Sequence, residues 1–318
     1  MPAIPHTGRY SATFSGVNGP GEARPANTWG AIDIERACVY TCLFGGYEEL
    51  VEQPAASAST LPFVCITDDP ELSSETWAIR VVESVLPLDP ARASRHPKLF
   101  PEQYLAEADA SVYIDNSVRL KGPPDGLLNA GLADPETGLA LARHSFHTSL
   151  RQEADAILRL GFEDPDRVDD LVHVVERLAP ELLEERPYWG GLLIRRHGDA
   201  AVGPAMSDWW NHVLRYSRRD QLSLPLVLAR HPDVGVSELA LDNHESAYHE
   251  WPVAPRPGRE SYAAEARGSA RYRELEQELA ATQARNHQLA STLDQLTRSL
   301  SWRVTAPIRA LAAKARQR

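Results

Sequence analysis

An acidic residue directly follows a short apolar run in the middle of the chain. Ser111–Ile114 predicts a buried strand, and Asp115 is the first residue after it. Open α/β sheets bind ligands at the carboxyl ends of their strands, which favours a binding role over that of a turn or capping residue. Asn116 and Ser117 add weaker oxygen donors. Mn²⁺ or Mg²⁺ would accept these oxygens together with those of a phosphate, so the spacing predicts a metal and phosphate site at Asp115.

A nitrogen ligand for the same ion would come from the C-terminal side of the chain. His244 or His249 could supply it, because Mn²⁺ accepts imidazole as well as oxygen. Both histidines follow the last predicted element, where they could equally be incidental loop residues. A zinc site at Cys38 and Cys42 is disfavoured, because no second pair of ligands lies near them in the sequence.

Basic residues beside predicted strand ends and helix starts are suited to phosphate. Arginine makes bidentate contacts to phosphate oxygens, and lysine acts as a point charge. Lys98, Arg143 and His144 are the strongest candidates, although each alone also fits an ordinary surface charge. The other members of this basic set are Arg95, Arg195, Arg196 and His197.

Polar residues at three further turns complete the predicted site. Gly45–Tyr47 follows the first apolar run, where a glycine pair lets a ligand approach the backbone or simply makes a turn. Asp68–Asp69 follows the second run. Asp220–Gln221 stands at a helix start, where the aspartate either orients a ligand or caps the helix.

The elements that must position these residues read as strands alternating with helices. Short runs rich in β-branched and aromatic residues predict strands. They span Ala37–Phe44, Pro62–Thr67, Thr76–Val82, Ser111–Ile114, Leu139–His144 and Tyr188–His197. Apolar residues recur at helix spacing over 150–158, 171–178 and 209–214. This alternation predicts an α/β fold with a mostly parallel sheet and helices on both faces.

The two ends of the chain differ in composition from the middle. Residues 1–34 predict a disordered leader, 35–256 the α/β domain and 257–270 a linker. Over 271–300, seam residues alternate at spacings of four and three, which predicts an oligomeric coiled coil rather than a helix packed on its own domain. Residues 301–318 predict a basic amphipathic tail for an anionic membrane surface, or a solvated end. The seam residues are Leu275, Leu279, Thr282, Asn286, Leu289, Leu293, Leu296 and Leu300.

Composition limits the classes of partner and the cellular location that we expect for the protein. A net charge of −11 without a basic stripe disfavours nucleic acid as a partner. Cys38, Cys42 and Cys65 fall in apolar runs and predict the reduced, buried thiols of a cytoplasmic protein. We see no signal-peptide pattern, and no apolar run approaches the ~20 residues of a membrane span. The expected location is therefore cytoplasmic, peripheral at the inner face of the plasma membrane through the tail.

The order of the motifs resembles the TOD/MUCI-type glycosyltransferase-like family of plant and bacterial proteins. The matching segments cover roughly residues 36–232. They are Val39–Tyr47, Phe63–Asp69, Arg95–Lys98, Tyr113–Asp115, Arg143 and His144 with Arg151 and Glu153, and Arg218–Ser223. The resemblance implies a GT-A-like fold and transfer of sugar from a nucleotide-sugar donor to a glycan or lipid-linked acceptor. Ser299–Arg309 resembles a segment common in bacterial cell-surface glycosyltransferases, which implies a role in cell-surface glycan assembly.

The resemblance also implies roles for individual residues. Asp115 would position the donor through a metal or the ribose, and Asp220 would orient sugar or acceptor hydroxyls. The implied donor-binding residues are Gly45, Gly46, Tyr47, Asp68, Asp69, Lys98, Asn116, Ser117, Arg143, His144 and Gln221. Two alternatives remain. Ser117 replaces the second acid of an Asp-x-Asp turn, which favours a non-catalytic module that binds a glycan or a partner enzyme. A hydrolase acting on a lipid also stays open, since one plant member is linked to ceramide hydrolysis, although no Gly-x-Ser-x-Gly elbow is present.

Overall fold

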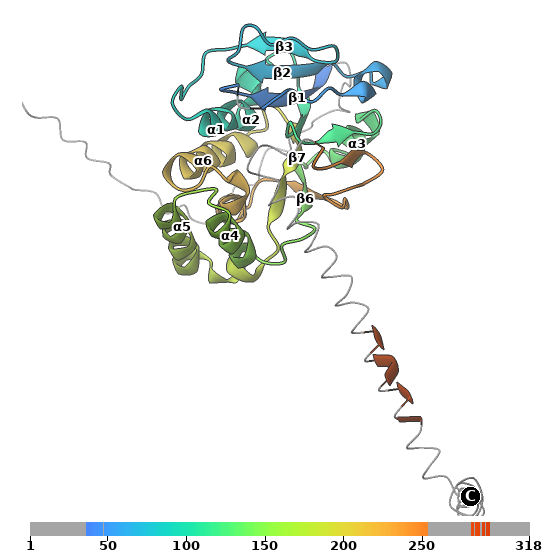
Figure 1. Ribbon diagram of the computed structural model, residues 1–318, viewed down its shortest axis with the longest axis vertical. Coiled ribbons are helices and arrows are strands. Elements are labelled where there is room, and N and C mark those ends of the chain that lie inside the picture. Colours follow the sequence, from blue (N-terminus) through green and yellow to red (C-terminus); the bar gives the residue numbers. More distant parts are fainter. Residues whose placement is uncertain are drawn as a thin grey trace, which may run out of the picture.

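The computed structural model describes residues 36–46 and 48–253, together with 281–282, 284–286, 288–289 and 291–292. Within these residues a seven-stranded sheet forms the centre, with helices on both faces (Figure 1). Its strands are β1 (Ala37–Leu43), β2 (Phe63–Thr67), β3 (Ala78–Val81), β4 (Ala110–Ile114), β6 (Leu139–Arg143), β7 (Tyr188–Arg196) and β8 (Val236–Leu239). A separate small pair joins β5 (Arg119–Leu120) to β9 (His249–Glu250).

The sheet is mostly parallel, as the sequence predicts. Its strand order is β3-β2-β1-β4-β7-β6-β8. Parallel pairs join β1 to β2 and β4, β2 to β3, and β6 to β8. The exception is β7, which runs antiparallel to both β4 and β6. The first residues of β7 therefore lie at the edge where the other strands of the sheet have their carboxyl ends.

Apolar side chains cover both faces of the sheet. Along β1, Tyr40 and Cys42 pack on one face and Val39 and Leu43 on the other, because successive strand residues alternate. A strand buried on both sides needs the nearly continuous apolar run that the sequence has here. The first face packs against α1 (Pro90–Ala93), α2 (Arg95–Leu99), α6 (Val202–Arg215) and α7 (Leu224–Arg230), and the second against α3 (Asp125–Gly131).

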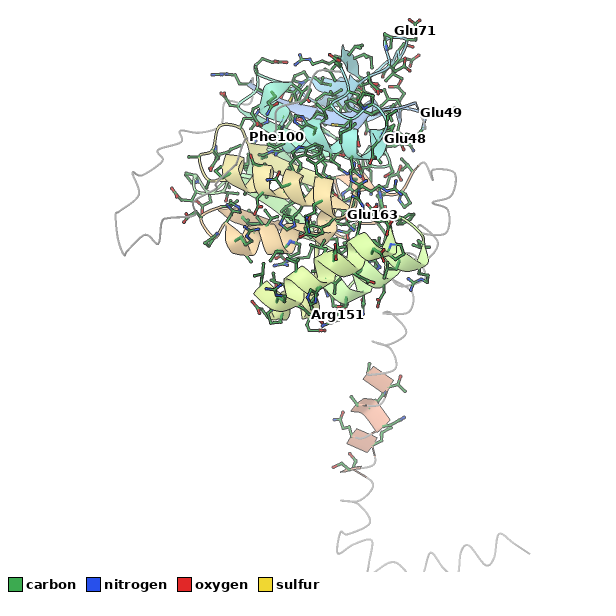
Figure 2. The ribbon with its side chains drawn as sticks, turned by 90° about the vertical axis from the view of Figure 1, so that its left-hand side faces the viewer. Glu48, Glu49, Glu71, Phe100, Arg151 and Glu163 are labelled. Atoms are coloured by element: carbon green, nitrogen blue, oxygen red, sulfur yellow. The ribbon has the colours of Figure 1, made fainter. Side chains whose placement is uncertain are left out.

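A helical pair forms a third apolar cluster beside the sheet. It consists of α4 (Leu150–Arg159) and α5 (Pro165–Leu178), followed by a short 3-10 helix, η4 (Pro180–Glu184). The Ser149 hydroxyl caps α4 by accepting a hydrogen bond from the Gln152 amide at 3.3 Å. Glu163, which is labelled in Figure 2, joins this pair to the rest of the domain. Its carboxylate lies 2.8 Å from the Arg92 guanidinium.

Several elements differ from the sequence-based expectation at their ends. The third strand begins at Ala78 rather than Thr76, because Thr76 belongs to a loop and its hydroxyl accepts from the Gln53 amide at 2.8 Å. The fifth predicted strand ends at Arg143, one residue early. The short β5, β8 and β9 were not predicted, since two to four residues carry too little periodicity. The apolar run over 222–228 divides into η5 (Asp220–Leu222) and α7.

The three cysteines are free and buried, which confirms the predicted reduced thiols. Burial raises the pKa of Cys38 and of Cys65 to about 12, so both stay protonated at neutral pH. In the described part of the chain, Cys38 and Cys42 belong to no three-residue metal-ligand group.

The predicted terminal segments fall mainly outside the described residues. This holds for the leader (1–34), the linker (257–270) and the tail (301–318). Within 281–292 the described residues are helical, and Leu289 is 56% exposed. The coiled coil over 271–300 therefore stays a prediction. None of the described helices combines the length and hydrophobicity needed to cross a membrane.

Candidate functional site

The carboxyl ends of the parallel strands meet the start of β7 at one edge of the sheet. The Asp115 amide donates to the Gly191 carbonyl at 2.8 Å, which fixes β7 beside the end of β4. A Cβ atom added at Gly190 would lie 3.1 Å from the Lys98 Nζ and 3.3 Å from an Asp220 carboxylate oxygen. Glycine at position 190 thus lets charged side chains from two other elements approach the strand.

Lys98 and Asp220 form a buried ion pair at this edge. Lys98 extends from α2, and its ammonium donates to the Asp220 carboxylate and, at 2.9 Å, to the Gly190 carbonyl. The Arg95 guanidinium lies 3.5 Å from the same carboxylate oxygen. Lys98 is 1% exposed and Asp220 4%. Burial alone would raise the pKa of Asp220, but the charges of Lys98 and Arg95 outweigh it and hold the pKa below its ordinary value.

Asp115 lies next to this pair and is half-buried. Its carboxylate accepts a hydrogen bond from the Tyr113 hydroxyl at 2.9 Å. The Lys98 ammonium lies 4.8 Å from the centre of the Tyr113 ring, a cation–π contact. The negative charge of Asp115 also acts on the pKa of Asp220, which it raises. The structure thus brings together three residues that the sequence singled out: Asp115, Lys98 and Asp220.

The two residues after Asp115 have structural partners. The Asn116 side chain accepts from the Val51 amide at 2.9 Å and donates to the Glu49 carbonyl at 2.8 Å. The Ser117 hydroxyl accepts from the Trp251 indole at 3.0 Å. Both residues therefore hold neighbouring loops in place, which their types at a strand end do not reveal.

The turns after β1 and β2 line the same edge of the sheet. Gly45 and Gly46 have positive φ angles of 74° and 58°, a conformation that glycine adopts most readily. The Asp68 carboxylate accepts from the Gly45 amide at 2.8 Å and so joins the two turns. The Asp69 carboxylate accepts from the Glu71 amide at 2.9 Å within its own turn. Tyr47 lies outside the described residues.

Arg143 and His144 have different partners, although the sequence pairs them. Arg143 lies over the Tyr188 ring at 3.9 Å and forms a 3.1 Å ion pair with Glu238 of β8. It lines a cavity of about 370 Å³ near the edge of the sheet, together with Arg186. His144 also lines this cavity, but its side chain is fully buried.

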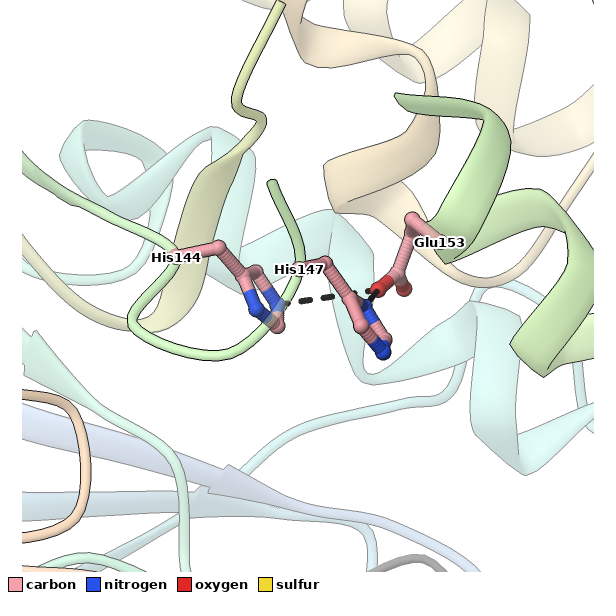
Figure 3. Close-up of side chains that lie close together, drawn as sticks. All are labelled: His144, His147 and Glu153. Atoms are coloured by element: carbon pink, nitrogen blue, oxygen red, sulfur yellow. Dashed lines mark hydrogen bonds and ion pairs between the residues drawn. The ribbon is translucent and has the colours of Figure 1, made fainter. Parts of the chain in front are cut away.

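His144 belongs instead to a buried cluster with His147 and Glu153 (Figure 3). The His147 Nδ1 lies 2.5 Å from the Glu153 Oε2, and the His144 Nε2 lies 3.6 Å from the same oxygen. The two imidazole rings stack with centroids 4.8 Å apart. Burial alone would raise the pKa of Glu153, but the His147 hydrogen bond and the charges of His144, His147 and Arg219 lower it to about 2. The Glu153 carboxylate is therefore ionised at neutral pH.

Gln221 connects this cluster to the Lys98–Asp220 pair. Its Nε2 donates to the His144 Nε2 at 3.0 Å and to the Glu153 Oε1 at 2.6 Å. Its Oε1 accepts from the Gly190 amide at 3.3 Å, which fixes the orientation of the side-chain amide. The two predicted residues Asp220 and Gln221 thus sit at the junction of two buried polar groups.

The two histidines that the sequence offers as metal ligands differ. His249 has protein partners at both ring nitrogens, the Ser246 hydroxyl at 2.8 Å and the Asn243 carbonyl at 3.1 Å. His244 lies against Phe146 and Trp251, with ring centroids 5.3 and 5.5 Å away. Both of its ring nitrogens are buried, and neither has a hydrogen-bond partner among the described residues.

The donor set around Asp115 fits a hard cation poorly on its own. Such ions take six or more oxygen ligands, and the turn offers one carboxylate and one hydroxyl. Across the described residues, only His144, His147 and Glu153 form a group of at least three residues able to hold a metal. A divalent cation held by Asp115 and His244 therefore stays a prediction.

Sequence reasoning assigned no site role to several members of this edge, although Glu153 stands in a segment that matches the family. No sequence pattern marks Gly190, because its importance lies in the close approach of Lys98 and Asp220 to its backbone. His147 and Glu153 did have one: two histidines three residues apart, followed by an acid six residues later at the start of a helix, have the spacing of metal ligands. The cationic residues Arg195, Arg196 and His197 lie at the opposite end of β7, away from this edge.

Comparison with known proteins identifies the family. Residues 31–241 of the 318 match the family described as "TOD1/MUCI70, glycosyltransferase-like domain". The chain belongs to this family. This TOD1/MUCI70-family protein is 23% identical over 235 residues to the alkaline ceramidase TOD1 of Arabidopsis thaliana, covering 64% of this chain and 51% of the relative. It is 27% identical over 157 residues to the probable hexosyltransferase MUCI70 of the same plant, covering 48% of this chain and 27% of the relative.

The chain therefore spans about half or less of the length of these curated relatives. Among solved structures, it is similar to mouse xyloside xylosyltransferase 1 in its apo form. The TM-score is 0.39 with 11% identity, over 64% of this chain and 84% of that chain. Family membership makes this a glycosyltransferase-like protein.

Proposed function

We propose that this protein is a hexosyltransferase with a GT-A-like fold that moves a sugar from a nucleotide-sugar donor to a cell-surface glycan or lipid-linked acceptor. The observation that carries the proposal is the buried Lys98–Asp220 pair beside Asp115, at the carboxyl edge of a sheet in a glycosyltransferase-like family. Open α/β sheets bind ligands at this edge. The relative named a probable hexosyltransferase supports this reaction class.

Each residue of the edge has a distinct task in this proposal. Asp115 is half-buried and contacts the donor, whose position it fixes. Asp220 is ionised and orients a sugar or acceptor hydroxyl, and Gln221 supports it. Lys98 and Arg95 hold the charge and position of Asp220 through their ion pairs with its carboxylate. Positioned charges of this kind are effective because they need no rearrangement during the reaction.

A divalent cation has a limited place in the proposal. Mn²⁺ or Mg²⁺ would be held by Asp115 and the donor phosphates, with His244 as a further ligand, and would neutralise phosphate charge. Asp115 is the one carboxylate in its own turn, so most of the ligands would have to come from the donor. The roles of Asp220, Lys98 and Arg95 do not depend on this ion.

The test compares two aspartates at opposite ends of β4. We expect Asp115→Asn to reduce release of nucleoside diphosphate from a panel of nucleotide sugars by on the order of 100-fold or more, since one key electrostatic contact is lost. Asp109 precedes the same strand and forms a half-exposed 2.9 Å ion pair with Arg36. Asp109→Asn should therefore leave turnover unchanged. Equal turnover of the Asp115 variant and the wild type would show that the active site lies elsewhere.

Two other functions have specific support. The serine in place of a second acid favours a module that binds a glycan without catalysis. The relative named an alkaline ceramidase favours lipid hydrolysis. Release of nucleoside diphosphate that depends on an acceptor separates transfer from both. Binding of a glycan without such release supports the module, and release of fatty acid from ceramide supports the hydrolase.

For assembly and location, we propose a homo-oligomer through 271–300 and a cytoplasmic protein that the 301–318 tail holds at an anionic membrane surface. A chain that ends at residue 257 should be a monomer, whereas the full chain should scatter light as a dimer or larger. Asn286→Leu should raise the stability of the oligomer but blur its stoichiometry, because a polar seam residue selects one state. A monomeric full chain at tens of micromolar would contradict the coiled coil.

A further inference from the structure

The lone pairs of His144 and Glu153 converge on one point in the buried cluster. The Gln221 Nε2 occupies that point, donating one hydrogen to the His144 Nε2 and the other to the Glu153 Oε1. The His147 Nδ1 supplies a third contact to Glu153. His144 and Glu153 are fully buried and His147 is 6% exposed. The Gln221 amide thus occupies the position in which a cation could be bound by His144, His147 and Glu153.

The spacing of the ligand atoms suits a small four-coordinate ion. Bonds of ~2.0–2.1 Å in a tetrahedron place neighbouring ligand atoms about 3.3 Å apart. The His144 Nε2 and the Glu153 Oε2 already lie 3.6 Å apart. The His147 Nδ1 and the same oxygen share a proton at 2.5 Å, so replacing that proton by a metal requires them to separate by less than about 1 Å. We propose that His144, His147 and Glu153 form a binding site for a divalent transition metal, with Zn²⁺ as the best-fitting ion.

The chemistry of the ligands selects this class of ion. Two imidazoles and one carboxylate suit Zn²⁺ and its neighbours, whereas Mg²⁺ and Ca²⁺ prefer sets made of oxygen alone. Three protein ligands leave one coordination position for water or another ligand. The site is separate from the predicted cation at Asp115, and it does not depend on the proposed sugar transfer.

Two neighbouring side chains limit the affinity of the site. The Arg219 guanidinium lies 3.9 Å from the Glu153 Oε1, and its positive charge repels a second cation. The Gln221 amide must leave its hydrogen bonds to His144 and Glu153 when a metal enters. Since the same amide accepts from Gly190 and follows Asp220 in the chain, metal binding would also shift the Lys98–Asp220 edge.

The experiment measures metal binding directly, without an activity assay. The full chain is stripped with a chelator, dialysed and titrated with Zn²⁺ by calorimetry, with Co²⁺ as a spectroscopic probe and Mg²⁺ as a comparison. We expect one equivalent of Zn²⁺, the strong visible absorption of four-coordinate Co²⁺, and much weaker binding of Mg²⁺. His147→Gln should weaken the Zn²⁺ affinity at least about 100-fold, because even outer-shell changes weaken metal sites by 10–100-fold. His197→Gln, a matched change in another buried histidine at the opposite edge, should leave it unchanged.

A second variant keeps the proposal falsifiable if the His147 variant does not fold. Arg219→Met keeps the aliphatic stem and removes the repelling charge, so it should tighten Zn²⁺ binding several-fold. Circular dichroism without metal shows which variants are folded. Failure of the stripped wild type to bind an equivalent of Zn²⁺ would overturn the proposal. So would equal affinity of the folded His147 variant, or an Arg219 variant that binds no more tightly than the wild type.

Discussion

The carboxyl edge of the sheet and the opposite edge both contain buried cations and histidines, but the hydrogen-bond partners of these residues differ. At the carboxyl edge, Lys98 donates to the carboxylate of Asp220, and two histidines meet the carboxylate of Glu153. At the opposite edge, Arg196 donates to the carbonyls of Thr137 and Leu132 at 3.1 and 2.9 Å. There Arg195 donates to the Leu99 carbonyl at 2.6 Å, and His197 to the Ala108 carbonyl at 2.8 Å.

The difference lies in the partners rather than in the buried cations and histidines. Backbone carbonyls are neutral and fixed in position. The cations at the opposite edge therefore serve to satisfy the hydrogen-bonding capacity of the backbone around them. Side-chain carboxylates carry charge and converge with other ligand atoms, which is the arrangement that can bind a substrate or an ion. A basic group near a strand end is therefore informative only when its partner is known.

The largest expected effect separates these two kinds of burial. Lys98→Met should lower the free energy of unfolding by about 3–5 kcal/mol, because it leaves the Asp220 carboxylate buried with its main partner removed. Adding Asp220→Asn should restore part of this loss. Arg196→Met should cost only about 1–3 kcal/mol, since it leaves neutral carbonyls unsatisfied. Urea unfolding of the four proteins measures the difference, and equal costs at the two edges would remove the distinction.

The two edges should also lose stability in different pH ranges. Burial and the charge of Arg195 lower the pKa of His197 from 6.5 to about 4. Below pH 6.5 the unfolded chain binds a proton that the folded chain does not, so stability should fall by about 3 kcal/mol as the pH drops to about 4. Glu153 has a pKa lowered from 4.5 to about 2, so its contribution is lost only between those values.

Chemical unfolding at a series of pH values measures these contributions. His197→Gln should flatten the profile between pH 6.5 and about 4 and leave the decline at lower pH. Buried His249, whose pKa is also lowered by burial, adds to the same range in both proteins and cancels in the comparison. A variant profile that matches the wild type would show that His197 takes up its proton in the folded protein.

The smallest effect is expected in the core between the edges. Cys38→Ala should lower stability by only about 1 kcal/mol, because it removes one buried atom from β1 and leaves a small cavity. Turnover per folded molecule and Zn²⁺ affinity should both match the wild type. A loss of either would mean that the core of β1 contributes to the site beyond its packing.

The sequence by itself determined the class of the fold and much of one edge. Apolar runs and helix-spaced residues sufficed for the α/β sheet, because hydrophobic periodicity is a local property. The family motifs placed Asp115, Lys98, Asp220, Gln221 and His144 in the candidate site, and the structure brings these five into one region. The coiled coil over 271–300 and the basic tail over 301–318 also rest on local sequence patterns, and both remain predictions.

Tertiary structure alone decided the direction of β7 and the partners of each charge. The antiparallel course of β7 carries Arg195–His197 to the far edge and brings Gly190 to the near one. The burial of His144 with His147 and Glu153 also depends on the tertiary structure, although the spacing of the three in the sequence is that of metal ligands. These outcomes depend on strand order and on contacts between residues far apart in the chain, such as Lys98 and Asp220, and local sequence patterns contain no information about such pairings.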